Sequence, residues 1–137
     1  MATRIRLGNP GTMPKPGGAY SHVARVAAGD LLFIAGQVAA DANGKVVGED
    51  DFEAQAQQVF ANLRAALQSE GADFRHVVQF TTYLVDSRDI AKLRAYRDRV
   101  YPTLFPDGKY PPNTLLVVER LASEAMRLEI AAIAAPD

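Results

Sequence analysis

The chain has 137 residues, a length that suits one domain with a buried core. Its formal net charge is −1 and it has no cysteine, which excludes disulfides, thiol nucleophiles and cysteine-ligated metals. The same charge balance offers no strong attraction for nucleic acid or anionic membrane, and no stretch reaches the roughly 18 apolar residues of a membrane span. No long apolar segment follows the first residues, so a cytoplasmic protein is expected, with residues 1–137 forming a single domain.

The first third of the sequence alternates between short strands and turns. After a short first strand, the segment 9–18 is rich in Pro and Gly and predicts a long loop. Segments 20–26 and 31–37 have strand character, and residues 28–30 between them are typical of a hairpin turn. A second turn is predicted at residues 41–45.

Two helices are predicted next. The first covers residues 50–70, where Asp50 with Glu53 resembles a capping pair and Gly71 suits the end. The second begins at residue 86 or 87 and runs to Val100, and Pro102 is expected to end it. Both have apolar residues at spacings of three and four, which predicts one buried side on each. These residues are Phe52, Ala56, Val59, Phe60, Leu63 and Leu67 in the first helix, and Ile90, Leu93, Tyr96 and Val100 in the second.

The remaining strands are predicted at residues 77–85, 114–119 and 126–134. The order β-β-β-α-β-α-β-β predicts an α+β fold with both helices on one face of a six-stranded mixed sheet, because two helices cannot cover both faces. Residues 115–118 are all apolar, so both faces of their strand require burial. This pattern predicts a homo-oligomer whose sheets pack together. The alternative is a monomer with loops over one face.

Common catalytic motifs are missing from the sequence. His22 and His76 have no ligand-like spacing, so no metal site is expected. There is no Gly-x-Ser-x-Gly elbow and no Gly-rich phosphate loop. The basic residues of the second helix are scattered, which favours a solvated face over a surface that binds nucleic acid.

Glu129 and Tyr20 are the residues most open to a functional interpretation. Glu129 lies in an apolar strand, where Leu128 and Ile130 point to one face and Glu129 points to the other. Such a carboxylate is either paired with a cation such as Arg127 or kept to transfer protons and position water. Tyr20, at the end of the long loop, is either a core aromatic or the wall of a pocket.

Several segments together resemble the RidA/YjgF family, the reactive intermediate (imine/enamine) deaminases, which also carry the description endoribonuclease L-PSP. Residues 18–21 (Gly-Ala-Tyr-Ser) and 34–38 (Ile-Ala-Gly-Gln-Val) resemble its opening motifs. Residues 55–71 and 77–86 resemble its first helix and central strand, and residues 128–134 resemble its closing Ile-Glu-Ile-Glu-Ala-Ile-Ala pattern. The resemblance extends from about residue 14 to 135.

This resemblance implies a chorismate-mutase-like α+β fold that forms homotrimers, with the sheets inside a barrel-like centre and ligand clefts between subunits. Members of the family hydrolyse 2-imino or 2-enamino acids to ammonia and a 2-keto acid, without metal or cofactor. The partners implied are therefore further copies of the chain and a small molecule, with no nucleic acid and no membrane.

Site residues follow from the resemblance position by position. Glu129 matches the glutamate that positions water, and Tyr20 matches the pocket tyrosine. Gly36 matches the pocket glycine, although Ala35 stands where active members usually have Ser. Tyr83 matches an aromatic position facing the cleft.

The carboxylate-binding arginine of the family is missing. Its Pro-Ala-Arg-Ser/Thr pattern reads Pro-Pro-Asn-Thr at residues 111–114, so Asn113 stands at the arginine position. An arginine offers paired charged donors worth roughly 1.5–3 kcal/mol per bond, against about 1 for a neutral amide. Arg94 or Arg97 of the second helix is a candidate replacement, and the alternative is that both are solvated.

Two functions are therefore compatible with the sequence. One is a RidA-like hydrolase of imines, enamines or related small molecules, in which Glu129 positions water and Asn113 or Thr114 binds a substrate that need not carry an α-carboxylate. The other is a trimer that binds a small metabolite without turnover. RNA cleavage, which is sometimes attached to this family, is disfavoured by the charge balance.

Overall fold

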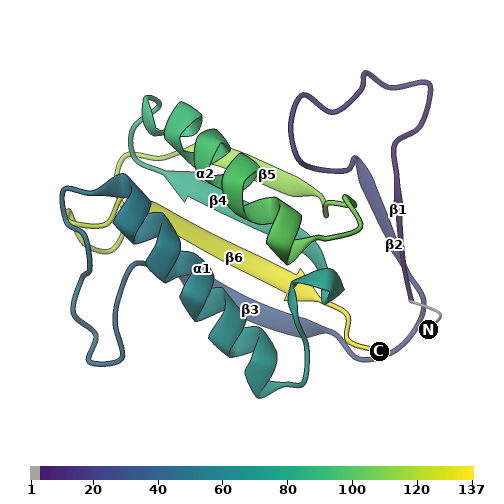
Figure 1. The fold of residues 1–137 in the computed structure, drawn as a ribbon, viewed down its shortest axis with the longest axis horizontal. Helices are drawn as coiled ribbons and strands as arrows, with labels where there is room; N and C mark the ends of the chain where they lie inside the picture. Colours follow the sequence, from purple (N-terminus) through teal and green to yellow (C-terminus); the bar gives the residue numbers. More distant parts are fainter. Residues whose placement is uncertain (1–3) are drawn as a thin grey trace.

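The computed structural model describes residues 4–137. Residues 1–3 lie outside the described part. The prediction that no leader peptide is present concerns these first residues. Within it, strands and helices follow the predicted order, with a short 3₁₀ helix added before β4 (Figure 1). The elements are β1 (Ile5–Gly8), β2 (Val23–Val26), β3 (Leu32–Gln37), α1 (Phe52–Ser69), η1 (Phe74–His76), β4 (Val77–Leu84), α2 (Asp89–Leu104), β5 (Asn113–Val117) and β6 (Leu128–Ala134).

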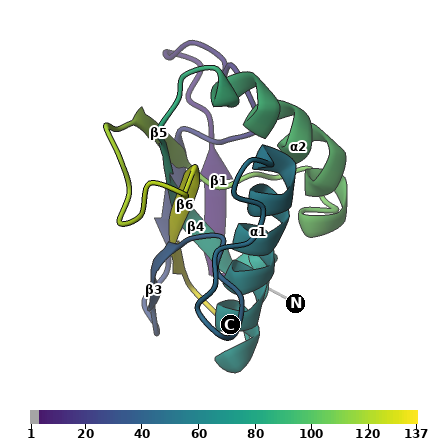
Figure 2. The same cartoon turned by 90° about the vertical axis from the view of Figure 1, so that its left-hand side faces the viewer.

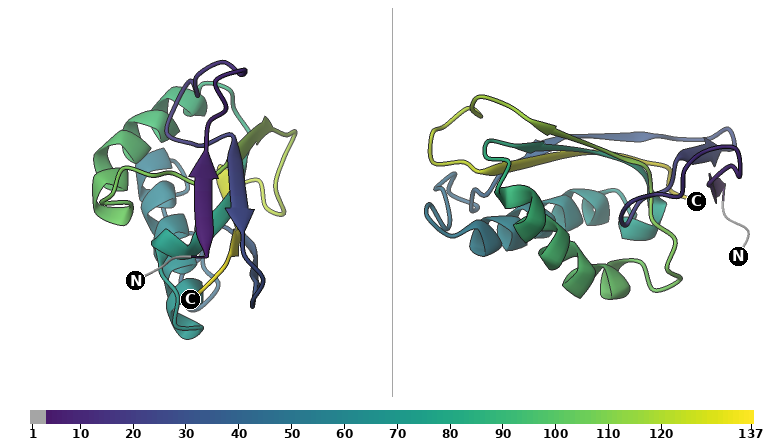
Figure 3. Two further views of the ribbon diagram at one scale, coloured as in Figure 1. Left: turned by 90° about the vertical axis from the view of Figure 1, so that its right-hand side faces the viewer. Right: turned by 90° about the horizontal axis from the view of Figure 1, so that it is seen from above.

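The main sheet is mixed and has four strands in the order β3-β6-β4-β5. β6 is antiparallel to both of its neighbours, and β4 pairs with β5 in parallel. Both helices lie on one face of this sheet, as Figure 2 and the right-hand view of Figure 3 show. The predicted α+β class, with two helices on one face of a mixed sheet, is confirmed.

The prediction of one continuous six-stranded sheet is wrong for the single chain. β1 and β2 form a separate antiparallel pair beside the main sheet (Figure 1). The connection from β2 to β3 is not a hairpin, because the Arg4 guanidinium occupies its inside and donates hydrogen bonds to the carbonyls of Ala27 and Asp30. Gly29 has a φ of +155°, and a Cβ there would lie 2.4 Å from Arg4 Cζ. Arg4 thus ties this connection to the start of β1, and β2 pairs with β1 rather than with β3.

The ends of α1 are set by local hydrogen bonds. Asp51, rather than the expected Asp50, caps the start, because its Oδ1 accepts from the Ala54 N–H at 3.1 Å. At the other end, the N–H of Ala72 donates to the Leu67 carbonyl at 2.9 Å around Gly71, whose φ is +71°. This is a Schellman closure, and the glycine confirms the predicted stop.

The second helix differs from the prediction at both ends. It begins at Asp89, because the Asp86 carboxylate accepts the Arg88 N–H at 2.9 Å and holds the preceding residues in a turn. It continues through Pro102 to Leu104. A proline in the last turn removes a single N–H, and the helix still closes with a 2.7 Å bond from the Phe105 N–H to the Tyr101 carbonyl.

The core lies between the helices and the sheet. All six residues of the predicted apolar side of α1 are buried there. They pack with an aromatic cluster contributed by both helices, η1, β4 and the segment after α2. The cluster contains Phe60, Phe74, Phe80, Tyr96, Tyr101, Phe105 and Tyr110.

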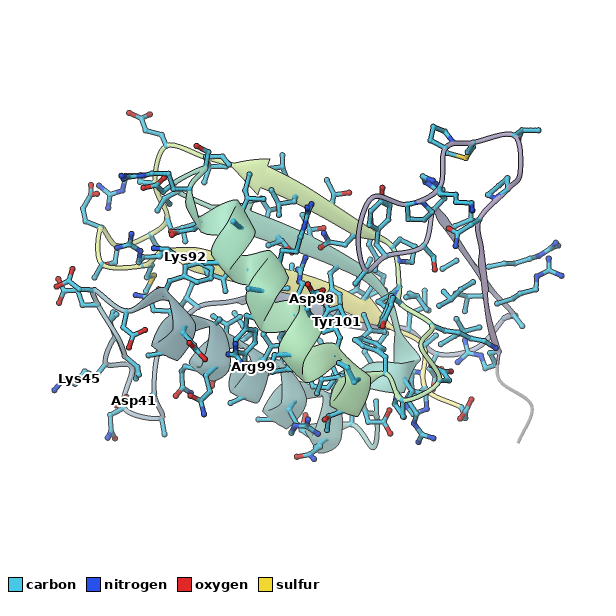
Figure 4. All side chains as sticks on the ribbon, turned by 45° about the horizontal axis from the view of Figure 1, so that its top comes forward. Asp41, Lys45, Lys92, Asp98, Arg99 and Tyr101 are labelled. Carbon is cyan, nitrogen blue, oxygen red and sulfur yellow. The ribbon has the colours of Figure 1, made fainter. Side chains whose placement is uncertain are left out.

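The predicted turn at 41–45 is also present, where the Asp41 N–H donates to the Lys45 carbonyl at 2.9 Å (both residues are labelled in Figure 4).

The other face of the main sheet is uncovered in the single chain, and we call it the open face. Phe33 is 73% exposed there, and Leu116 of β5 is 40% exposed. Leu115 of the same strand is half-buried against the core on the helix side.

Among the described residues, no helix is long and apolar enough to cross a membrane.

Candidate functional site

The predicted site residues form two groups on opposite faces of the sheet. Glu129 lies on β6 between Leu128 and Ile130, which are both buried, so its side chain points to the open face as predicted. Tyr83 is its cross-strand partner on β4. We call Glu129, Gly36, Ala35 and Tyr83 the open-face group.

Gly36 makes room for the Glu129 carboxylate. The register of β3 against β6 shifts between Ile34 and Gln37, which is the mark of a β-bulge. The bulge brings Gly36 so close to Glu129 that a Cβ would lie 2.6 Å from Oε2. A side chain at this position would therefore have to displace the Glu129 carboxylate from where it lies.

The Glu129 carboxylate has no ion pair and no hydrogen bond within residues 4–137. Arg127, its expected structural partner, instead places Nε 3.5 Å from Asp89 Oδ2 at the start of α2. Glu129 is half-buried rather than hidden, so its oxygens remain accessible from the open face. The structural salt bridge with Arg127 is therefore wrong, and the carboxylate is left available for a ligand or water.

Ala35 of the open-face group and one further predicted residue, Thr114, are exposed on this face. Ala35 is exposed on β3 and lines a hollow of about 430 Å³ that also includes Thr81 and Ala131. Thr114 is exposed on β5, in register with Thr81 of β4. Thr114 therefore lies on the same face as Glu129, whereas its neighbour Asn113 points to the helix side.

The second group surrounds a pocket between α2, β5 and the end of the long loop, with a volume of about 310 Å³. We call it the helix-side pocket. Three predicted residues besides Asn113 contribute to its wall: Tyr20, Arg94 and Arg97. The full lining is Gly17, Gly18, Ala19, Tyr20, Ile90, Leu93, Arg94, Arg97, Asp98, Asn113 and Leu115.

Arg97 is the main charged group of this pocket. It is only 9% exposed, so the prediction of a solvated residue is wrong. Its Nη2 donates to Thr82 Oγ1 at 2.8 Å and approaches Asn113 Oδ1 at 3.5 Å. Its Cζ lies 5.7 Å from the ring centroid of Tyr101, whose phenol pKa is raised by burial and which therefore stays neutral.

Thr82 connects Arg97 to Asn113. Its hydroxyl accepts from Arg97 and donates to Asn113 Oδ1 at 2.7 Å. The Asn113 amide NH₂ forms no hydrogen bond within residues 4–137, so it can serve as a donor to a ligand. Thr82 was not a predicted site residue. The only signal was a polar residue at a helix-facing position of a strand whose other helix-facing residues, Phe80 and Leu84, are apolar.

Other residues shape the mouth of the pocket. Arg94 and Asp98 both line it and are exposed, and they do not pair with each other. The loop that carries Tyr20 is fixed to the segment before β5, because the Ser21 N–H donates to the Pro111 carbonyl at 3.4 Å and the Ser21 hydroxyl donates to the Tyr110 carbonyl at 2.5 Å. Tyr20 is therefore a pocket wall and not a core aromatic.

The fold and these two groups define a class: a small α+β protein with a ligand pocket beside α2 and a lone carboxylate on an open sheet face. Comparison with known proteins makes the assignment specific. The family model described as Endoribonuclease L-PSP matches residues 11–136, and the chain belongs to that family, which includes the Rid and RutC proteins.

Individual relatives support the same assignment. A RutC family protein of Pyrococcus horikoshii is 36% identical over 121 residues, covering 88% of this chain and 90% of the relative. Protein DfrA of Myxococcus xanthus is also 36% identical over 121 residues, with 88% of each chain covered. The crystal structure of YyfB from Yersinia pestis, a Rid family protein of unknown function, superposes with a TM-score of 0.86 at 36% identity, covering 96% of this chain and 98% of that one. The predicted family is thus confirmed.

Proposed function

We propose that this protein is a RidA-like hydrolase that converts reactive 2-imino or 2-enamino acids into 2-keto acids and ammonia. The observation that carries the proposal is the Glu129 carboxylate, which is accessible, unpaired and given its space by Gly36. Family membership supports chemistry of this kind. In this proposal the attacking group is a water molecule held by the Glu129 carboxylate.

Glu129 would act as general base and then as general acid. As water adds to the imine carbon, a C–O bond forms and the carboxylate accepts a proton from that water. The protonated carboxyl passes that proton to the nitrogen, which gives the carbinolamine. Glu129 then moves the hydroxyl proton to the same nitrogen, so the C–N bond breaks, ammonia leaves and the carbonyl forms. A 2-enamino acid first gains a proton at its β-carbon and loses one from nitrogen to become the imine. Atoms balance with one water consumed, and neither an oxidant nor a reductant is needed.

A complete site requires more than one copy of the chain. Glu129 points to the open face and the helix-side pocket lies on the other, so one small molecule cannot touch both within a chain. We therefore propose a homotrimer in which the pocket of one subunit meets the open-face group of the next. The exposed apolar residues of the open face favour this association. Light scattering on purified protein tests it, and a monomer at all concentrations would contradict it.

The activity test uses a 2-imino acid generated in the cuvette by an amino-acid oxidase, with the loss of the imine followed over time. Wild type should accelerate that loss, and Glu129→Gln should lower kcat by about 10²–10⁴-fold, the usual contribution of a general base. Glu70→Gln, the same change at the far end of α1, serves as the control and should keep full activity. Equal rates for wild type and Glu129→Gln would overturn the proposal.

A second function is favoured by two departures from the family pattern, Asn113 at the arginine position and Ala35 at the serine position. In this alternative, the trimer binds a small metabolite without turnover. Calorimetry followed by recovery of the ligand separates the two functions, since a binding module returns its ligand unchanged.

A further inference from the structure

The helix-side pocket contains a buried cation that forms no ion pair with the part of the chain that the structure describes. Arg97 is nine-tenths buried, and no Asp or Glu within residues 4–137 forms an ion pair with it. Its Nε has no hydrogen-bond partner. A guanidinium that is removed from water and left unpaired is costly, so a bound anion at this position would be favourable.

The position of the guanidinium is fixed before any ligand arrives. Thr82 and the Oδ1 of Asn113 hold Nη2, and the Tyr101 ring lies beside Cζ. A pre-positioned arginine offers a planar set of donors that matches the two oxygens of a carboxylate. The free amide of Asn113 adds a neutral donor on the same side.

Asn113 is suited to this arrangement because it is neutral. An arginine at 113 would bring a second cation against Arg97 and would remove the Oδ1 acceptor that Thr82 and Arg97 share. A cation at position 97 on α2 is therefore compatible with a neutral amide at position 113 on β5 and not with a second cation. We infer that Arg97 binds the carboxylate of the ligand in the helix-side pocket, and that Thr82 and Asn113 are positioning residues for its guanidinium.

The remaining groups limit the class of ligand. The other charges facing the pocket, Arg94 and Asp98, are opposite in sign and exposed, so they largely offset each other in solvent. Ile90, Leu93 and Leu115 line the rest of a volume of about 310 Å³. The ligand is thus a small carboxylate with a short apolar body. For turnover this inference rests on the proposed function, but for binding it does not.

The test measures binding of 2-oxobutanoate, a stable small keto acid, by calorimetry on the purified full-length protein. We expect Arg97→Gln to weaken binding by about 10- to 100-fold, the loss expected for charge-assisted bonds, and Arg97→Lys to restore part of it. Arg97→Met keeps the site apolar and folded if Gln at this buried position destabilises the chain. Arg99→Gln, a matched change on the α1 side of the same helix, should leave binding unchanged.

A second experiment exchanges the two residues. Asn113→Arg alone should bind 2-oxobutanoate more weakly than wild type and lower the melting temperature, because two cations meet. Adding Arg97→Gln to that variant should recover affinity, so the effects of the two changes would be strongly non-additive. Tighter binding by Asn113→Arg with Arg97 still in place would overturn the inference, because it would mean that Arg97 does not hold the carboxylate.

The two proposals fail in different ways. Arg97-dependent binding of 2-oxobutanoate without imine hydrolysis would remove the hydrolase function and leave the inference standing. Imine hydrolysis with the same KM in wild type and Arg97→Gln would support the hydrolase function and overturn the inference about Arg97. Absence of 2-oxobutanoate binding by wild type, or a loss caused by Arg94→Gln and not by Arg97→Gln, would overturn the inference.

Discussion

The open-face group and the helix-side pocket solve different physical problems. No cation or hydrogen-bond donor within residues 4–137 contacts the Glu129 oxygens, and Gly36 leaves room for the carboxylate. Arg97 is held by a chain of hydrogen bonds through Thr82 to Asn113. An unpaired carboxylate is free to exchange protons, whereas a fixed guanidinium is suited to recognition. Substitutions in the first group should therefore alter kcat, and those in the second should alter KM.

The largest effect is expected from Gly36→Ala. The new Cβ would lie 2.6 Å from Glu129 Oε2 and must displace the carboxylate, so kcat should fall by about 10²-fold or more while KM changes little. Steady-state kinetics on a 2-imino acid measure this. Gly11→Ala is the control, because a Cβ at Gly11 meets nothing within 4 Å. Retention of full activity by Gly36→Ala would separate Glu129 from the chemistry.

Leu116→Asp on the open face should weaken self-association. Losing the burial of a leucine side chain costs about 1.5–3 kcal/mol, which lowers the association constant by roughly tenfold or more per contact. Activity should decline in parallel, because the two groups would no longer meet across subunits. Sedimentation velocity and kinetics at matched concentrations measure both. Met13→Asp, at a similarly exposed position in the long loop, should affect neither.

Thr82→Val probes the helix-side pocket with little change of shape. The substitution removes the hydroxyl that joins Arg97 to Asn113, so KM should rise by about three- to tenfold and kcat should stay near wild type. Unfolding by urea should show a loss of about 1–2 kcal/mol. Thr103→Val on the exposed side of α2 is the matched control. A selective fall in kcat for Thr82→Val would contradict the division between the two groups.

The smallest effect concerns the connection between β4 and α2, which joins the two groups. A hydrogen bond from the Arg88 side chain lowers the pKa of Asp86 to about 2 from its usual 3.8. A lowered pKa stabilises the fold above the unfolded value, and that contribution disappears as the pH falls from about 4 to about 2. Because Asp86 is exposed, the change in overall stability should be slight. Carboxyl NMR titration measures the pKa of Asp86. If the Arg88 hydrogen bond causes the shift, this pKa should return towards 3.8 in Arg88→Gln.

Strong local patterns made much of the fold predictable. The spacing of apolar residues in α1 and the alternation around Glu129 each depend on the period of one element, so they could be read without knowledge of the tertiary structure. The prediction placed β1 and β2 in the main sheet, whereas the structure does not. The connection after β2 is contacted by Arg4, which is distant in sequence from the turn at Gly29. No local pattern encodes such a contact.

The site was predictable as a set of positions but not as a set of interactions. Asn113, Glu129 and Gly36 could be located by resemblance to the family. The burial of Arg97 could not, because the other arginines of α2 are exposed and a scattered set of basic residues favoured solvent. Pro102 inside the helix was missed for a similar reason, since one lost N–H near a helix end is tolerated when the core holds the adjacent Tyr101.

The parallel pairing of β4 with β5 has a consequence for how this protein folds. Thr82, Arg97 and Asn113 belong to consecutive elements, so the carboxylate-binding arrangement is contained in one strand–helix–strand unit. Gly36 and Glu129 come from opposite ends of the chain and meet only when β3 joins β6. Short sequence separations close faster than long ones, so the recognition site should assemble early and the catalytic site late. A partly folded chain would then bind its ligand before it acquired the means to react with it.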